Sequence, residues 1–182
     1  MIPSATDDVR RHLLTGEHIV WRGAPFPGLM FQPMDAFLIP FSLLWGGFAI
    51  LWNAGVWLVE APIFLRLWGL PFLAVGLYFI FGRFLFDMRI RRRLVYLVTD
   101  RRILILKRSG AIQARSLDIK RLPIIELHER ADGSGTIRFG QSPGMFGGNN
   151  NGMWAPSSDP TPQFLRIVDV RRVYELIQKH AD

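Results

Sequence analysis

The sequence predicts a membrane-anchored, mostly-β protein: a two-helix transmembrane hairpin inserted into a seven-stranded antiparallel β domain with a C-terminal capping helix. Three observations predict this fold class. Two long apolar runs lie in the first half of the chain, short strand-like runs separated by turns follow them, and one more strand-like run precedes them. We expect residues 1–32 to form a short helix and the first strand. The hairpin should occupy 33–87, and residues 88–182 should complete the cytoplasmic domain.

The polar N-terminal segment predicts a helix followed by a strand. Thr6 or Asp7 can cap a short helix by accepting a backbone N–H, and Gly16 can end that helix. Glu17–Arg22 has the composition of a strand, and Pro25 soon after it favours an end to the strand. The first 35 residues contain no apolar stretch of the kind found in a cleavable signal peptide. We therefore expect both apolar runs to remain in the mature protein.

The two apolar runs predict the hairpin. Ala36–Trp52 contains no charge and would span about 26 Å as a helix, close to the roughly 30 Å of a bilayer's hydrocarbon core. The second run covers about 63–83, where Arg66 can extend its charge to the interface. Lipid offers no partner for a backbone amide, so each run should be helical despite Pro40 and Pro71. The alternative is a buried helical hairpin of a soluble protein, which would take up most of its core.

The charge distribution predicts the orientation. The net charge is +7, and residues 67–130 hold 13 of the 22 Lys and Arg residues but only 5 of the 15 Asp and Glu residues. The positive-inside rule then places both termini in the cytoplasm and the loop between the helices outside. A basic chain can indicate a nucleic-acid partner. Here the excess basic residues lie beside a hydrophobic span, which favours a phospholipid membrane as the partner. We expect no nucleic-acid partner. The residues expected to set topology, contact lipid headgroups, or do both are Arg83, Arg89, Arg91, Arg92 and Arg93.

The rest of the chain predicts six strands and a helix. Leu94–Thr99 and Arg102–Lys107 are rich in Leu, Val and Ile and flank a tight turn. Asp169 can cap a last helix, in which apolar residues recur at the spacing of one helical face. Six strands would leave an open sheet, so Glu17–Arg22 should complete it and the hairpin should lie between the first two strands. The other strands are expected at 111–117, 122–128, 136–139 and 164–168, and the apolar face of the helix at Val170, Val173, Tyr174 and Ile177.

This pattern resembles the bacterial pleckstrin-homology-like membrane proteins. The matching residues are Gly16-Glu17, Trp21-x-Gly23-x-Pro25, Tyr96-x-Val98-Thr99-Asp100-Arg101-Arg102-Ile103, Gly135-Thr-Ile-Arg-Phe-Gly140 and Phe164-x-x-Ile167-x-Asp169. The similarity covers about 15–179, and the Thr-Asp-Arg-Arg segment is its most specific part. The resemblance implies a strongly bent seven-stranded sheet, or partial barrel, plugged at one end by the C-terminal helix. It also implies a bacterial inner-membrane location and no enzymatic activity, and the family has no agreed ligand.

One departure limits what the resemblance implies. Phosphoinositide-binding pleckstrin-homology domains carry clustered Lys and Arg in the loop between their first two strands. In this chain that connection is the membrane hairpin, so a similar inositide pocket is not expected here.

Two further groups of residues are candidates for surface binding. Arg101 and Arg102 can join the basic surface after the hairpin. Alternatively, Asp100 caps the turn and the arginines pair with nearby carboxylates. The long loop 140–163 is rich in Gly, Asn, Pro and Ser, and loops of this length are usually functional or disordered. Its apolar residues can dip into the membrane, dock a partner, or fold over the open end of the barrel. They are Met145, Phe146, Met153 and Trp154.

The sequence gives little support to catalysis. The four histidines, at 12, 18, 128 and 180, lack the spacing of metal ligands, and the absence of Cys excludes thiolate chemistry. We expect no catalytic residue, metal or cofactor. The leading hypothesis is a non-enzymatic scaffold or assembly protein whose cytoplasmic domain binds proteins, anionic lipids or both at the membrane surface, with a protein partner or self-association. The alternative is a transport accessory or membrane enzyme that acts through the hairpin.

Overall fold

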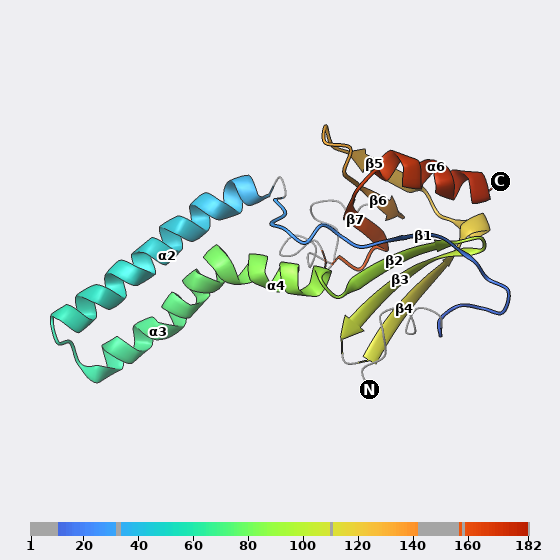
Figure 1. Cartoon of the computed structure of the whole chain (residues 1–182). Coiled ribbons are helices and arrows are strands. Elements are labelled where there is room, and N and C mark those ends of the chain that lie inside the picture. The colour runs from blue at the N-terminus through green and yellow to red at the C-terminus, as the bar shows by residue number, and fades with distance from the viewer. Residues whose placement is uncertain (1–10, 32–33, 110, 142–156, 158, 182) are drawn as a thin grey trace.

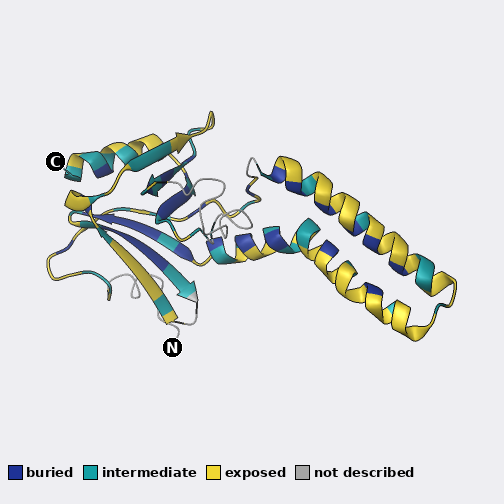
Figure 2. Ribbon diagram, turned by 180° about the vertical axis from the view of Figure 1, so that it is seen from behind, coloured by how far each residue is buried: buried dark blue, intermediate teal, exposed yellow. Residues whose placement is uncertain are grey.

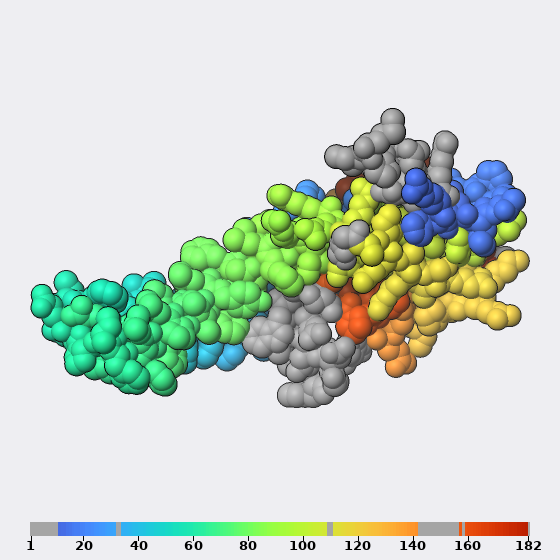
Figure 3. All heavy atoms as spheres, turned by 90° about the horizontal axis from the view of Figure 1, so that it is seen from below, coloured from blue at the N-terminus to red at the C-terminus, as the bar shows by residue number. Residues whose placement is uncertain are grey.

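The computed structural model describes residues 11–31, 34–109, 111–141, 157 and 159–181. It consists of a β module and a pair of long helices that project from one side of that module (Figures 1 and 3). In chain order the elements are β1 (Ile19–Gly23), α2 (Asp35–Leu58), α3 (Ile63–Leu77), the π-helical turn η1 (Tyr78–Gly82), α4 (Arg83–Arg91), β2 (Leu94–Thr99), β3 (Arg102–Ser109), β4 (Ala111–Asp118), the 3₁₀ turn η2 (Ile119–Arg121), β5 (Ile125–Glu129), β6 (Gly135–Phe139), β7 (Gln163–Ile167) and α6 (Val170–Ala181).

The long helices leave and re-enter one sheet. The first sheet is antiparallel with the order β1-β2-β3-β4, and β1 pairs with β2 although all of α2 to α4 lies between them in the sequence. Trp21 faces Val98 and Gly23 faces Tyr96 across this pair. Both ends of the helical hairpin are therefore tied to the same two neighbouring strands.

The seven predicted strands are present, but they form two sheets rather than the single bent sheet that we expected. The second sheet is antiparallel with the order β5-β6-β7, and no closed barrel is seen in the part of the chain that the structure describes. The separation has a local cause: η2, with Ile119 buried, and Pro123 carry the chain away from β4 before β5 begins. On the other side, the Phe26 N–H donates to the Arg166 carbonyl at 3.1 Å and links the connector after β1 to β7.

Several predicted boundaries were wrong. The first strand is Ile19–Gly23 rather than Glu17–Arg22, because Glu17 lies in a turn before it. β5 begins at Ile125 rather than at 122, because the chain is still leaving η2 and Pro123 has no N–H to donate to a ladder. β7 ends at Ile167, and Val168 is exposed. Residues 11–16 form turns rather than the end of a helix, and the rest of that predicted helix lies outside the described residues.

The core lies between the two sheets and α6. The predicted apolar face of α6 is confirmed, with Val170, Val173 and Ile177 buried against both sheets. The rings of Tyr96 and Phe164 stack at a centroid distance of 4.6 Å and join β2 to β7. Buried residues line the inner face of the module, as Figure 2 shows in dark blue. A smaller cluster on the outer face of the first sheet consists of Leu97, Leu104 and Leu106, with Leu13 packed on it.

Both projecting helices are longer than predicted. α2 continues to Leu58 because the Asn53 amide, which would be costly to leave unpaired, donates to the carbonyls of Ala49 at 2.8 Å and Gly69 at 3.0 Å. The second helix runs without a break from Ile63 to Arg91 through η1. Both are long and apolar enough to cross a membrane. Only 28% and 11% of their most apolar windows are buried, so neither resembles the core helix of a soluble domain (Figure 2).

Small residues let the two helices approach closely. A Cβ on Gly76 would lie 2.9 Å from the Cα of Gly46, a distance at which the backbones would have to move apart. The pair therefore sets the spacing between α2 and α3, as small residues do at helix interfaces in membranes.

Candidate functional site

The base of the hairpin contains a buried ion pair between two helices. Arg83, the first residue of α4, donates to Asp35, the first residue of α2, at 2.5 Å, and the two side chains are only 4% and 6% exposed. The Arg83 Nε also donates to the Phe79 carbonyl at 3.2 Å. Within the described residues the Arg83 Nη2 has no hydrogen-bond partner. This contact fixes where α2 and α4 meet.

A second buried pair ties α4 to the β module. Arg91 donates to Asp87 at 2.7 Å, one helical turn earlier, and also to the Phe26 carbonyl at 2.5 Å in the connector after β1. The other oxygen of Asp87 accepts bonds from the Ser157 amide at 3.1 Å and hydroxyl at 2.7 Å. α4 is therefore held from both the connector and the segment that precedes β7.

The structure separates the five arginines that the sequence grouped together. Arg83 and Arg91 are 3% and 1% exposed and bind carboxylates inside the protein, whereas Arg89, Arg92 and Arg93 are exposed. No carboxylate of the described residues lies within 4.0 Å of those three. Their proposed part in topology and lipid contact remains a prediction.

The end of β3 adds two cations next to the exposed arginines. The Arg108 amide donates to the Arg93 carbonyl at 2.9 Å, and Lys107 faces Leu94 across the β2–β3 pair. Sequence reasoning missed both residues. The predicted pairing of 94–99 with 102–107 could have found them, because it brings the end of one strand beside the start of the other. Lys107 and Arg108 point to opposite faces of the strand, so we define the junction basic surface without Lys107: Arg89, Arg92, Arg93 and Arg108.

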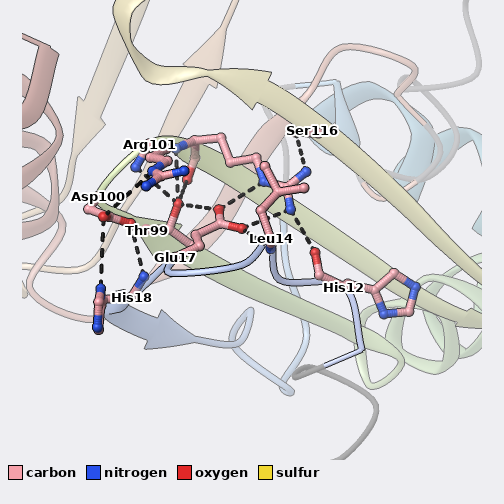
Figure 4. A network of polar contacts seen from close by, with 9 residues as sticks. His12, Leu14, Glu17, His18, Thr99, Asp100, Arg101 and Ser116 are labelled. Atoms are coloured by element: carbon pink, nitrogen blue, oxygen red, sulfur yellow. Dashed lines mark hydrogen bonds and ion pairs between the residues drawn. The ribbon is translucent and has the colours of Figure 1, made fainter.

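Glu17 lies at the centre of a polar network at the opposite end of β2 (Figure 4). One oxygen accepts from the Thr99 hydroxyl at 2.7 Å and from Arg102 Nε at 2.8 Å. The other accepts from Arg102 Nη2 at 2.9 Å and from the Leu14 amide at 2.6 Å. The Glu17 side chain is fully buried. The network closes the N-terminal segment over the turn between β2 and β3.

Ionisation of this pair is strongly favoured. Burial by itself would raise the pKa of Glu17, but the hydrogen bonds from Arg102, Leu14 and Thr99 outweigh it and lower the pKa to about 2. The same contact raises the pKa of Arg102. Arg102 thus follows the alternative interpretation, in which it pairs with a carboxylate, and its contacts hold the fold together. Arg101 remains 56% exposed, 4.0 Å from Asp100.

The turn itself is capped by a different residue from the one expected. The Thr99 hydroxyl accepts from the amides of Arg102 at 2.9 Å and Arg101 at 3.3 Å. Asp100 instead accepts from the His18 amide at 3.0 Å, at the start of β1. The specific Thr-Asp-Arg-Arg segment therefore serves to join the turn to the N-terminal segment.

The remaining candidates lie elsewhere. Met145, Phe146, Met153 and Trp154 fall outside the described residues. His128, one of the four scattered histidines, forms a surface contact with Glu126 at 3.9 Å. The described ranges hold no group of three or more His, Asp and Glu side chains arranged to bind a metal ion.

No family model, no curated protein and no solved structure matches this chain.

Proposed function

We propose that this chain is a non-enzymatic integral membrane protein of the pleckstrin-homology-like type. Its helical hairpin spans the bacterial inner membrane, and its β module binds anionic lipids and protein partners at the cytoplasmic surface as a scaffold. One observation carries the proposal. The junction basic surface, with three exposed arginines that pair with no described carboxylate, lies where two long, exposed, apolar helices join the module.

Helix lengths support this placement. The helix from Ile63 to Arg91 has 29 residues and is about 43 Å long, whereas about 20 residues cross the hydrocarbon core. Counted from Ile63, twenty residues reach Gly82, and α4 then extends about 13 Å farther. Arg89, Arg92 and Arg93 would therefore lie at the depth of the lipid headgroups. The charges nearer the hydrocarbon, on Asp35 and Arg83, neutralise each other as a buried pair.

The far end of the hairpin supports the orientation. Arg66 is the only Lys or Arg of residues 36–82. Its Nε donates to the Ala61 carbonyl at 2.7 Å, and its guanidinium lies 5.2 Å from the centre of the Trp57 ring. A hairpin end with a single cation and a tryptophan beside it fits the outer side of the membrane under the positive-inside rule.

The attachment of the β module to the hairpin also favours a role in recruiting other proteins to the membrane. Each basic residue near an anionic surface contributes about 1 kcal/mol, so the four-residue junction basic surface can bind lipid headgroups even with modest individual contacts. Proteins bound to the module would then be held at high effective concentration near the membrane. β4 lies at the edge of the first sheet with a neighbour on one side only. Most of its side chains are exposed, so a strand of a partner or of a second copy can pair with it.

Lipid mass spectrometry after purification in mild detergent tests the proposal. We expect anionic phospholipids to be enriched with the protein relative to the whole membrane. Replacing Arg89, Arg92 and Arg93 with Gln should remove most of that enrichment. Replacing Lys120, Arg121 and Arg172 with Gln removes the same charge from exposed positions away from the junction and should not. Equal enrichment in both variants would contradict the lipid-binding role.

The alternative, a transport accessory or a membrane enzyme that acts through the hairpin, makes a different prediction. Substrate turnover or ion conduction by the reconstituted chain that persists when the β module is altered would favour it over the scaffold.

A further inference from the structure

A cleft of about 300 Å³ lies between the first sheet and the segment that leads into β7. In Figure 3 the atoms of β4, in yellow, lie beside this segment, in orange-red. The apolar wall of the cleft includes Leu94, Ile105 and Leu165, which are all buried. Lys107 and Arg115 also line it. The cleft therefore combines an apolar wall with two cations.

Lys107 and Arg115 occupy strand positions at which the alternating pattern predicts apolar side chains. Alternate residues of a strand share a face, so Lys107 lies on the same face as Ile103 and Ile105, which belong to the core. On β4, Leu117 faces Ile103 and packs against the core, whereas Arg115 faces Ile105. The core-facing side of the sheet thus changes from apolar to basic toward the cleft. Charged residues at inward positions are uncommon and informative.

Among the described residues that line the cleft, the one carboxylate is already neutralised. Asp159 accepts from the Thr161 amide at 2.9 Å and lies 3.6 Å from Arg138, and its side chain is 6% exposed. Arg115 donates one N–H to the Pro160 carbonyl, and a guanidinium has five donors. Lys107 makes no ion pair with any described carboxylate. The cleft is therefore positive overall.

The cleft adjoins the junction with the hairpin. Leu94 directly follows Arg93, and Ser157 in the opposite wall is bound to Asp87 of α4. If the hairpin spans the membrane, the cleft opens beside the headgroup layer. This step rests on the proposed function.

We propose that the cleft binds a phosphate monoester that carries an apolar group, supplied by an anionic lipid of the adjoining membrane. The phosphate lies between Lys107 and Arg115, and the apolar group lies against Leu94, Ile105 and Leu165. The two cations come from neighbouring strands on diagonal positions, whose spacing of about 7 Å lets one anion bind both. A phosphate has several oxygens to accept such charge-assisted bonds.

The probe for this site is n-butyl phosphate, with the full chain in phosphatidylcholine nanodiscs and binding followed by ³¹P line broadening. We expect butyl phosphate to bind about tenfold more tightly than inorganic phosphate, because its chain covers apolar wall. The K107Q/R115Q double variant should weaken butyl phosphate binding by about tenfold or more. The matched K120Q/R121Q variant loses the same charge from the exposed η2 turn and should bind as the wild type does.

A second variant tests the site independently, in case the K107Q/R115Q variant does not fold. Gln113→Glu changes an exposed cleft residue to its near-isostere, and the added negative charge should weaken binding severalfold. Butyl phosphate that binds the wild type, K107Q/R115Q and Gln113→Glu equally, or that binds none of them, would overturn the proposed site.

Competition identifies the source of the phosphate. Phosphatidic acid included in the nanodiscs should displace butyl phosphate if the natural ligand is a membrane lipid. Butyl phosphate binding that phosphatidic acid leaves unchanged would overturn the lipid source. Loss of lipid enrichment in the variant of Arg89, Arg92 and Arg93 is a separate result, so the cleft and the proposed function can fail independently.

Discussion

Glu17 and Arg102, 85 positions apart in the chain, form a two-point ion pair with N–O distances of 2.8 and 2.9 Å. The pair joins the segment before the hairpin to the turn between the first two strands after it. It therefore closes the β module near the point where the helical hairpin interrupts the first sheet.

Replacing Glu17 with Gln should destabilise the β module by about 2–3 kcal/mol, because the substitution leaves a partly buried guanidinium without its counter-charge. Thermal unfolding in one detergent, followed by the circular dichroism of the sheets, measures the loss. Glu129→Gln is the matched control, since Glu129 pairs with Arg171 on the surface, where the Arg171 side chain is 70% exposed. Equal destabilisation by both variants would contradict a special role for Glu17.

The Glu17 pKa also predicts how stability depends on pH. The folded pKa of about 2 lies below the ordinary value of 4.5. The contribution of Glu17 is therefore fully present above about pH 5 and is lost as the pH falls toward 2. Across that window the wild type should lose on the order of 2–3 kcal/mol more stability than Glu17→Gln, in which this group no longer titrates. Denaturant unfolding of both proteins at several pH values measures the difference. A difference that stays constant with pH would contradict it.

The Asp35–Arg83 pair should show strong coupling. Replacing Asp35 with Leu or Arg83 with Met alone leaves one buried charge unpaired and should cost about 3–5 kcal/mol. The double variant removes both charges and should lose less than either single variant. Thermal unfolding of the four proteins in nanodiscs completes the cycle. Additive losses would show that the two side chains contribute independently.

Close packing of the helices can be tested with glycines. Gly76→Ala places a methyl group 2.9 Å from the Gly46 backbone, so we expect a loss of about 1–3 kcal/mol. Gly47→Ala is the control on the facing helix, because a Cβ there meets no atom within 4 Å. It should leave stability unchanged or raise it slightly through helix propensity. The same unfolding assay compares them, and equal stability of the two variants would contradict the close contact.

Most of the secondary structure could be predicted because the patterns are local. Two long apolar runs predicted α2 and α3, the first without charge and the second with Arg66 near its start, and the spacing of Val170, Val173 and Ile177 predicted α6. Boundaries failed where a single side chain altered the backbone. Asn53 lets α2 continue beyond the predicted end, and η2 with Pro123 delays β5 and separates the sheets.

The site was harder to predict because its contacts join distant parts of the chain. In the sequence, Arg83 and Arg91 cannot be told apart from the nearby arginines that prove to be exposed. Only their partners, Asp35 and Asp87, distinguish them. Asp87 lies one helical turn before Arg91, so that pair could have been predicted had the helix been extended. The Asp35–Arg83 pair depends on how two helices cross, which a single sequence does not specify.

Substituted-cysteine labelling tests most directly whether the hairpin spans the membrane and holds the β module in the cytoplasm. The chain contains no Cys, so Glu60→Cys in the hairpin loop and Arg121→Cys in η2 each introduce a single reactive position on an exposed residue. With a thiol reagent that does not cross the membrane, intact spheroplasts should label position 60 at once and position 121 only after permeabilisation. Labelling of both positions from the same side would contradict the account.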